Sequence, residues 1–441
     1  MRVSSKWITL SLLFICVGCN PAEQLTNPIM VPNKTENTME KASIETKDPA
    51  TYQSYIDFFE KVYTLMNENY YKDIDRKEFD RFINVFNTKI YKELEETGKS
   101  DDFVRWRSAA YLIDFLKQKD DIFSAFYPPE PAKEYEATAL GKKVDLGIEG
   151  EKIMQGYRVK FVEPRSDAYE KGLKENDLVL SIDGTLSDSL TLERINELLT
   201  PLEGSTISLV YLDGTTQQQH SIDLVSKEYF KQGVFNVPIP VENLYCLQIK
   251  RFNRMTGEDM LRFIKYFSLQ GPMKGLIIDL RGNPGGPPLA AREISSFFLT
   301  GGDEFAYFQK KDQPKASLDV PVIPPELHYD GPLVILIDKG SGSASELFSG
   351  VLQNRKRAVL MGQNSAGQVF LKSMFPLDDK SMILLVTARG YQPDGQVFSF
   401  NGLTPDRVIN EQEQPDILKY AVSYLIYMNK IQENINEKTD G

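Results

Sequence analysis

The chain has 441 residues, enough for two or three domains, and a formal net charge of −11. This negative charge, together with the lack of a basic stripe, argues against a nucleic-acid partner. The three cysteines and two histidines do not cluster, so we expect no metal site, no disulfide and no cofactor.

The first residues have the pattern of an export signal. A basic start is followed by an apolar run from Ile8 to Val17, which is too short to span a bilayer as a helix. The run ends in Gly18-Cys19, which looks like a bacterial lipoprotein signal. Residues 1–18 are then a signal peptide, and a lipid on Cys19 anchors the chain to a membrane of the bacterial cell envelope. An ordinary secretory signal is the alternative.

The next two segments differ sharply in composition. Residues 19–50 are polar and cannot bury a core, which predicts a flexible tether. Residues 51–135 predict a helical N-terminal domain, because large apolar side chains recur at spacings of three and four. We interpret these aromatic stripes as a packed core rather than a binding surface.

Residues 144–226 predict a small domain of short strands and two helices. One strand starts at Leu146-Gly147-Ile148, and another spans residues 157–162. A short helix follows them, and then come two more strands with a second helix between these two. This order resembles a PDZ domain, which binds a chain end on backbone N–H groups and adds the peptide as an extra strand. The resemblance implies that Leu146, Gly147 and Ile148 form the carboxylate-binding loop. The alternative is a PDZ fold that only braces its neighbours.

Two strand-to-turn segments stand out in the remaining part, residues 236–430. Gly275 to Leu280 predicts a buried strand, and the glycine-rich turn Arg281 to Gly286 follows it. Leu333 to Ile337 predicts a second buried strand, followed by the small-residue turn 338–346 and a helix. This second arrangement places a serine hydroxyl beside N–H groups that have no partner within the helix. Serine hydrolases use such N–H groups to stabilise an oxyanion.

These motifs, in this order, resemble the carboxyl-terminal processing peptidases of family S41 over most of the mature chain. Residues 275–286 read GLIIDLRGNPGG, almost the family motif, and Ser343-Ala344-Ser345-Glu346 resembles the nucleophile segment. The resemblance implies an α+β fold with a helical N-terminal region, a PDZ domain and a mixed-sheet peptidase core. It also implies Ser343 as nucleophile, with an oxyanion held by the N–H of Ala344 and that of Gly285 or Gly286.

The departure from the family lies at the general base. The family has a lysine at the position of Gln368 and a glutamine at the position of Lys372, so the two residue types are exchanged here. Both positions share one face of a strand, and a lysine base must be neutral, which burial in an apolar pocket favours. We hypothesise that Lys372 is the base and Gln368 its orienting partner. The alternative is a solvated Lys372 and a weak or dead site.

Other residues near these motifs leave further alternatives open. Ser341 and Ser345 compete with Ser343 as nucleophile, although Ser345 is more simply a helix cap. His328, in the loop before the nucleophile strand, is a less favoured base, and Glu346 is expected to cap its helix. The sequence therefore predicts an envelope serine endopeptidase that acts on protein or peptide chains. The alternative is a related lipoprotein that binds peptides without cutting them.

Overall fold

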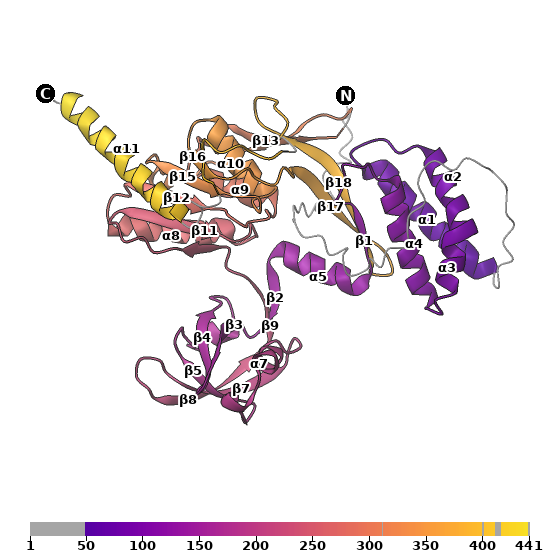
Figure 1. The fold of residues 1–441 in the computed structure, drawn as a ribbon, viewed down its shortest axis with the longest axis horizontal. Coiled ribbons are helices and arrows are strands. Elements are labelled where there is room, and N and C mark those ends of the chain that lie inside the picture. The colour runs from indigo at the N-terminus through magenta and orange to yellow at the C-terminus, as the bar shows by residue number, and fades with distance from the viewer. Residues whose placement is uncertain (1–48, 311, 399–400, 411–415, 440–441) are drawn as a thin grey trace.

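The computed structural model describes residues 49–439 except 311, 399–400 and 411–415. The predicted signal peptide, the lipid-bearing Cys19 and the tether lie outside these residues. Figure 1 shows a helical region, a small β-region and a larger sheet covered by helices, joined in that order along the chain. No helix in the described ranges is both long and apolar enough to cross a membrane.

The helical region contains α1 (Pro49–Asn69), α2 (Arg76–Val85), a π-helical turn (Phe86–Ile90), α3 (Tyr91–Glu95) and α4 (Asp101–Leu116). Side-chain oxygens of Asp75 and Ser100 cap α2 and α4 by accepting backbone N–H groups. The aromatic stripes form its core, as the periodicity predicts: Phe59, Phe82 and Phe86 are fully buried. This core also takes in side chains of β17 and β18, so the helices are attached to the peptidase sheets.

A short strand interrupts the segment 51–135 that the sequence predicts as a helical domain. Ala125–Tyr127 forms strand β1, which pairs antiparallel with residues 382–384 of β18, and α5 (Pro129–Leu140) follows it. A three-residue strand is too short to show an alternating pattern in the sequence. It forms because it pairs with a strand more than 250 residues away along the chain.

The small β-region is a six-stranded sheet with its own core. Its path runs β3-β4-β5-β7-β8, with β6 paired to β5, so that β3 is an edge strand. A separate antiparallel ribbon of β2 and β9 joins this region to the rest of the chain. The strands are β2 (Lys142–Asp145), β3 (Ile148–Ile153), β4 (Gly156–Val162), β5 (Leu178–Ile182), β6 (Thr185–Leu186), β7 (Thr206–Leu212), β8 (Gln219–Val225) and β9 (Lys227–Phe230), and the helices are α6 (Asp167–Glu170), a 3₁₀ turn (Ser187–Ser189) and α7 (Leu192–Leu199).

The larger sheet has the order β10-β11-β12-β15-β16-β19, in which all neighbours from β11 onward are parallel and β10 is antiparallel. Alternate side chains of each strand enter opposite cores. One face packs on α8, α9 and α10, and the other on α11. The elements are β10 (Val234–Asn236), β11 (Leu244–Ile249), α8 (Thr256–Gln270), β12 (Gly275–Asp279), α9 (Pro288–Ser295), β15 (Leu333–Ile337), α10 (Ala344–Asn354), β16 (Val359–Gly362), β19 (Arg407–Val408) and α11 (Ile417–Thr439).

A second sheet connects the helical region to this core. Its path is β1-β18-β13-β14, and β17 also pairs with β18. The strands are β13 (Glu304–Gln309), β14 (Ala316–Asp319), β17 (Phe370–Pro376) and β18 (Met382–Tyr391), and a 3₁₀ turn (Pro325–Leu327) precedes β15. The expected α+β class with a mixed-sheet core is confirmed.

Candidate active site

Ser343 stands at the turn between β15 and α10, at the carboxyl edge of the parallel sheet. Its backbone has φ 55° and ψ −110°, a conformation that side-chain-bearing residues rarely adopt. The side chain is 2% exposed, and Oγ has no hydrogen-bond partner among the residues that the structure describes. A buried hydroxyl without a partner on a strained backbone is a combination that functional sites show and structural serines rarely do.

The two neighbouring serines are already engaged. Ser341 Oγ donates a hydrogen bond to the carbonyl of Leu280 at 2.8 Å, and Ser345 Oγ donates to the carbonyl of Asn283 at 2.9 Å. Both hydroxyls therefore fasten the serine turn to the glycine turn that follows β12. Ser345 does not cap the helix as expected, because its hydroxyl is aimed across to the neighbouring turn. Of the three candidates, Ser343 alone keeps its hydroxyl unengaged within the described chain.

The glycine turn packs directly against Ser343. A Cβ on Gly285 would lie 2.8 Å from Ser343 Cβ and 2.9 Å from the backbone nitrogen of Ala344, and the φ of Gly285 is 104°. Only glycine allows both that approach and that backbone angle. Buried Asn283 holds the turn, because its carbonyl accepts the Gly342 N–H at 2.9 Å and its amide donates to the carbonyl of Ile249 at 2.7 Å.

The three predicted oxyanion donors differ in availability. The Gly285 N–H donates to Asn283 Oδ1 at 2.9 Å, so it is used within the turn. The N–H groups of Gly286 and Ala344 have no acceptor within the described part of the chain. Ala344 is the first residue of α10, where an N–H has no partner in the helix and the helix dipole favours negative charge. The geometry therefore favours Ala344 and Gly286 as the oxyanion donors.

Glu346 organises the site through four hydrogen bonds to one buried carboxylate. Oε2 accepts the N–H of Ser343 and that of Gln368, both at 2.8 Å. Oε1 accepts the Gly367 N–H at 2.7 Å and the Ser365 hydroxyl at 2.6 Å. Burial raises the pKa of the Glu346 carboxyl, while these donors act in the opposite direction. The expected helix-capping contact is present, and it also ties the serine turn to the loop that precedes β17.

Lys372 is buried on β17 but is not bonded to the serine. Its side chain is 1% exposed, and Nζ lies 4.2 Å from the centroid of the Phe123 ring. Its cross-strand partner Val386 packs into the core of the helical region. Because Ser343 Oγ has no hydrogen-bond partner within the described chain, the structure does not join Lys372 Nζ to it. The backbone of Gln368, rather than that of Lys372, is held beside Ser343 through Glu346.

Asp121 fixes the turn that carries Phe123, and sequence reasoning missed it. Its Oδ1 accepts the N–H groups of Phe123 and Ser124, both at 2.9 Å, and its Oδ2 accepts the Tyr70 hydroxyl at 2.8 Å. Asp121 is 2% exposed. A charged residue before an apolar stretch is too common in sequences to have identified this role.

Neither histidine lies at the serine. His328 precedes β15 whereas Ser343 follows it, so the two residues occupy opposite ends of a five-residue strand, which is roughly 15 Å long. His328 Nδ1 lies 3.1 Å from Asp330 Oδ1 instead. His220 is on β8 of the small region and stacks on Tyr211. A histidine base is therefore incompatible with this fold.

The predicted carboxylate-binding loop lies at the start of edge strand β3. Leu146 N–H donates to the carbonyl of Leu199 at 3.2 Å, and Gly147 N–H donates to Asp145 Oδ1 at 2.6 Å. Two of its three N–H groups are thus occupied by the chain itself. The β3 edge, which begins at Ile148, has no neighbouring strand within the described sheet.

Comparison with known proteins identifies the family. A model of peptidase family S41 matches residues 243–409. A carboxy-terminal-processing protease of Bartonella bacilliformis is 29% identical over 305 residues, which cover 68% of this chain and 68% of that protein. The carboxy-terminal processing protease CtpB of Bacillus subtilis is 26% identical over 392 residues, 83% of this chain and 71% of that protein.

Among solved structures, the photosystem II D1 C-terminal processing protease aligns with 81% of this chain and 93% of its own, at 21% identity and a TM-score of 0.46. The matched span 243–409 contains the glycine turn, the serine turn and the strand of Lys372. Residues 243–409 belong to peptidase family S41, a family of serine-type peptidases, and the relatives that align over two thirds or more of this chain are carboxy-terminal processing proteases.

Proposed function

We propose that this protein is a serine endopeptidase that cleaves protein chains near their C-termini or in disordered segments, through an acyl-enzyme on Ser343. The observation that carries the proposal is the state of Ser343 itself. Its hydroxyl is buried and unengaged within the described chain, at the N-terminus of α10 and against Gly285. The neighbouring Ser341 and Ser345 are bonded to carbonyls and are unsuited to attack.

In the proposed reaction, Ser343 Oγ forms a bond to the carbonyl carbon of the scissile peptide and gives its proton to the amine of Lys372. The N–H groups of Ala344 and Gly286 stabilise the oxyanion. When the C–N bond breaks, the lysine returns its proton to the leaving amine. A water then attacks the ester carbon with the lysine again as base, and the C–O bond to Ser343 Oγ breaks. The lysine returns its proton to Oγ, and the new C-terminal carboxylic acid is released.

Lys372 is the base of this proposal because a glutamine amide at position 368 cannot accept a proton at neutral pH. Lys372 is buried on the strand that follows Gln368, as a lysine base requires. Its amine rests over Phe123, and a cation–π contact favours the charged form of lysine. The catalytic state therefore requires Nζ to leave the Phe123 ring and approach Ser343, with the Gln368 side chain orienting it.

Substrate delivery is assigned to the small β-region, which we propose is a PDZ domain spanning residues 144–226. Edge strand β3 offers unpaired backbone groups on which an extended peptide can add as a further strand. We also place the protein in the bacterial cell envelope, held to a membrane by a lipid on Cys19, because the first nineteen residues have the pattern of a lipoprotein signal.

One observation favours a second candidate function, in which the protein binds peptides without cutting them. The position beside the nucleophile carries Gln368, and the lysine lies over Phe123 rather than on Ser343 Oγ. A protein that had lost hydrolysis would keep the peptide-binding edge and lose only the base.

The test is hydrolysis of casein by the purified mature chain, beside its Ser343→Ala and Lys372→Met variants. The proposal predicts turnover by the parent chain and loss of turnover in both variants. Equal turnover in all three would assign the activity to a contaminant. Turnover lost in Ser343→Ala and unchanged in Lys372→Met would leave the nucleophile in place and remove Lys372 as the base.

A further inference from the structure

Lys372 lies on the face of β17 that the helical region covers, and Figure 1 shows β17 and β18 between the helices and the parallel sheet. Its cross-strand partner Val386 is fully buried in the core of the helical region. The register of the two strands shifts between Leu371 and Lys372, and Leu371 packs into the core of the parallel sheet instead. Such a bulge re-aims the side chain beside it. The amine of Lys372 is thereby directed to the turn that follows α4, where it lies over the Phe123 ring.

Two hydrogen bonds fasten β18 to the helical region at the residue opposite Lys372. The N–H of Tyr71, which follows α1, donates to the carbonyl of Val386 at 3.1 Å. The N–H of Val386 donates to the hydroxyl of Ser124 at 2.9 Å, and Ser124 is fully buried. Both backbone groups of Val386 are thus bonded to residues that precede β1. The pair of strands that carries Lys372 is therefore fixed to the helical region at this point.

The turn that carries Phe123 is held by hydrogen bonds on both sides of the ring. One oxygen of Asp121 accepts the N–H groups of Phe123 and Ser124, and the other accepts the Tyr70 hydroxyl. The Tyr70 hydroxyl accepts in turn the N–H of Gln118 at 2.9 Å. These bonds connect the turn to the end of α1 and give the ring of Phe123 a fixed place beside β17.

The ring of Phe123 meets the ammonium group inside the protein. Lys372 Nζ lies 4.2 Å from the ring centroid, and the lysine is 1% exposed. Phe370, two residues before Lys372 on β17, packs beside the ring of Phe123 with centroids 6.0 Å apart. A cation–π contact is stronger where water is excluded, and it stabilises only the charged form of the amine. Phe123 therefore favours both this position of the amine and its protonated state.

The carboxylates around this contact have partners of their own. Asp121 accepts the donors of its own turn, and Glu346, on the side of the serine, accepts four hydrogen bonds. Asp120 is bonded to ionisable side chains of three other positions, Tyr71, Lys72 and Arg389. The group of this turn that contacts the ammonium of Lys372 is the aromatic ring.

The exchange of residue types at positions 368 and 372 brings the lysine to this ring. The backbone of Gln368 is held beside Ser343 through Glu346. Lys372 is four residues farther along the chain, a separation of up to roughly 13 Å in an extended strand. A lysine displaced in this way reaches the turn of Phe123. The departure from the family motif and the contact with the ring are thus two parts of one arrangement.

We propose that Phe123 is a positioning residue for the base. Its ring holds the charged amine of Lys372 away from Ser343 Oγ, so the helical region restrains hydrolysis until the amine leaves the ring. The inference rests on the proposed function, because it concerns when Lys372 can take the proton of Ser343. Removal of the ring then frees the base, whereas an ordinary substitution in the same core only weakens the fold.

The first measurement follows the lysine itself and needs no hydrolysis. The mature chain is labelled with carbon-13 at the ε carbons of its lysines and studied by NMR, and the signal that Lys372→Met removes is assigned to Lys372. The ring current of an aromatic face moves the ε protons of a lysine above it upfield. Phe123→Leu removes the ring, and Phe123→Tyr keeps it. Phe126→Leu is the matched control, because it removes a ring of the same core that packs on Phe58.

The Lys372 signal is expected upfield in the parent, in Phe123→Tyr and in Phe126→Leu, and at the ordinary lysine position in Phe123→Leu. The midpoint of its pH titration is expected to be about half a unit lower in Phe123→Leu than in the parent, because the charged form loses its aromatic partner. An ordinary Lys372 signal in the parent would overturn the proposal. A signal and a midpoint that Phe123→Leu leaves unchanged would overturn it as well.

The second measurement is hydrolysis of casein as a function of pH. Phe123→Leu is expected to raise kcat/KM at neutral pH about fivefold and to move the rising limb of the profile to lower pH, while Phe126→Leu leaves the limb in place. Equal or lower activity of Phe123→Leu with an unmoved limb would show that the ring is merely structural. The expected NMR signals in a protein of which no form cuts casein would retain Phe123 as the residue that positions the amine and reject the proposed hydrolysis.

Discussion

The backbone N–H of Ser343 and that of Gln368 donate to the same oxygen of Glu346, each at 2.8 Å. The backbones of residues from two different loops are thereby held side by side. One of them is the nucleophile Ser343, and the other is Gln368, at the position where the family has its lysine. The carboxylate that joins them is 1% exposed and accepts two further donors. Glu346 is thus a positioning residue for the site.

Glu346→Gln is expected to reduce kcat by about 100-fold with a much smaller change in KM. Whichever way the amide is turned, its NH₂ group faces at least one backbone N–H donor, so at least one of the hydrogen bonds that tie the serine turn and the 365–368 loop to residue 346 is lost. Unfolding free energy is expected to fall by about 2 kcal/mol. Steady-state kinetics and urea unfolding measure the two effects.

Ser365→Ala is the matched control, because it removes one of the four donors to Glu346 and leaves the three backbone N–H groups in place. It is expected to reduce kcat less than Glu346→Gln does. A Glu346→Gln protein with normal kcat would show that the shared carboxylate does not position the nucleophile.

Exchanging the two residues at the base is expected to restore the arrangement of the family. Lys372→Gln alone should lower kcat by about 100-fold or more, because it removes the proposed base. The double variant Gln368→Lys with Lys372→Gln should recover activity, because position 368 is already held beside Ser343 through Glu346. Peptide hydrolysis by both variants, compared with the parent chain, measures this. A Lys372→Gln enzyme as active as the parent would exclude Lys372 as the base.

Gly285→Ala is expected to abolish most activity, with kcat about 100-fold lower, and to destabilise the fold by about 2 kcal/mol or more. The added Cβ would lie 2.7 Å from the carbonyl oxygen of Gly342 and 2.8 Å from Ser343 Cβ. Gly282→Ala is the control, since Gly282 has a positive φ of 68° in the same turn but nothing within 4 Å of its added Cβ. It should lose about 1 kcal/mol of stability and keep its activity. Similar losses of kcat in both variants would trace the effect to backbone strain instead of the contact with Ser343.

The raised pKa of Glu163 makes a specific prediction about stability and pH. Burial raises this pKa from 4.5 to about 7 in the folded protein, so between these values the folded state binds the proton more tightly than the unfolded state. Glu163 therefore contributes stability that is fully present below pH 4.5 and is lost as pH rises to about 7. We expect Glu163→Gln to be more stable relative to the parent at about pH 8 than at about pH 5, by roughly 2 kcal/mol.

Urea unfolding of both proteins at the two pH values measures this difference. Glu149→Gln, which removes an exposed carboxylate on strand β3, is the control for the loss of a negative charge as such. If the free energies of unfolding of the parent and of Glu163→Gln differed by the same amount at both pH values, the pKa of Glu163 would not be raised in the folded protein.

The sequence alone determined the two turns and the family. The strand before each turn is a run of apolar residues, and glycines directly after such a run predict a tight turn. The start of α10 is marked by small residues followed by helical periodicity. Such signals are local, so a single segment carries them. The same holds for the aromatic core of the helical region, whose spacing was sufficient to predict it.

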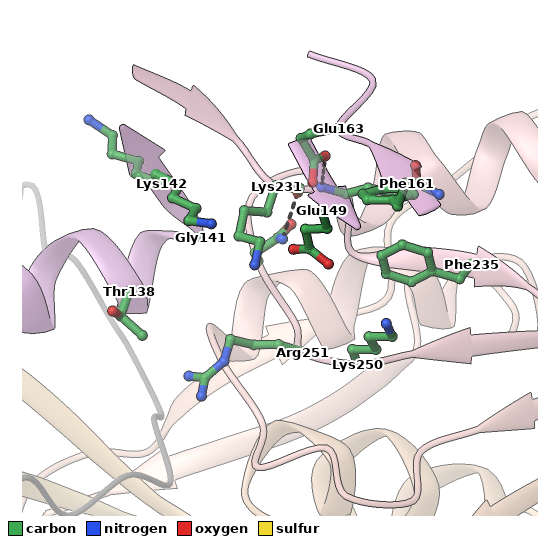
Figure 2. A pocket seen from close by; sticks show the side chains of 13 residues that line it. Thr138, Gly141, Lys142, Glu149, Phe161, Glu163, Lys231, Phe235, Lys250 and Arg251 are labelled. Carbon is green, nitrogen blue, oxygen red and sulfur yellow. Dashed lines mark hydrogen bonds between the residues drawn. The ribbon is translucent and has the colours of Figure 1, made fainter. Parts of the chain in front are cut away.

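Only the tertiary structure decided how those segments are used. Ser341 and Ser345 differ from Ser343 because their hydroxyls reach carbonyls of residues some 60 positions away, and Lys372 lies over Phe123 because Asp121 holds the turn that carries this ring. A cavity of about 520 Å³ that Glu149, Phe161, Lys231 and Lys250 line likewise joins residues from separate strands and loops (Figure 2). Hydrogen bonds, charge balance and burial between distant segments depend on how the chain packs, and no local pattern of residues encodes them.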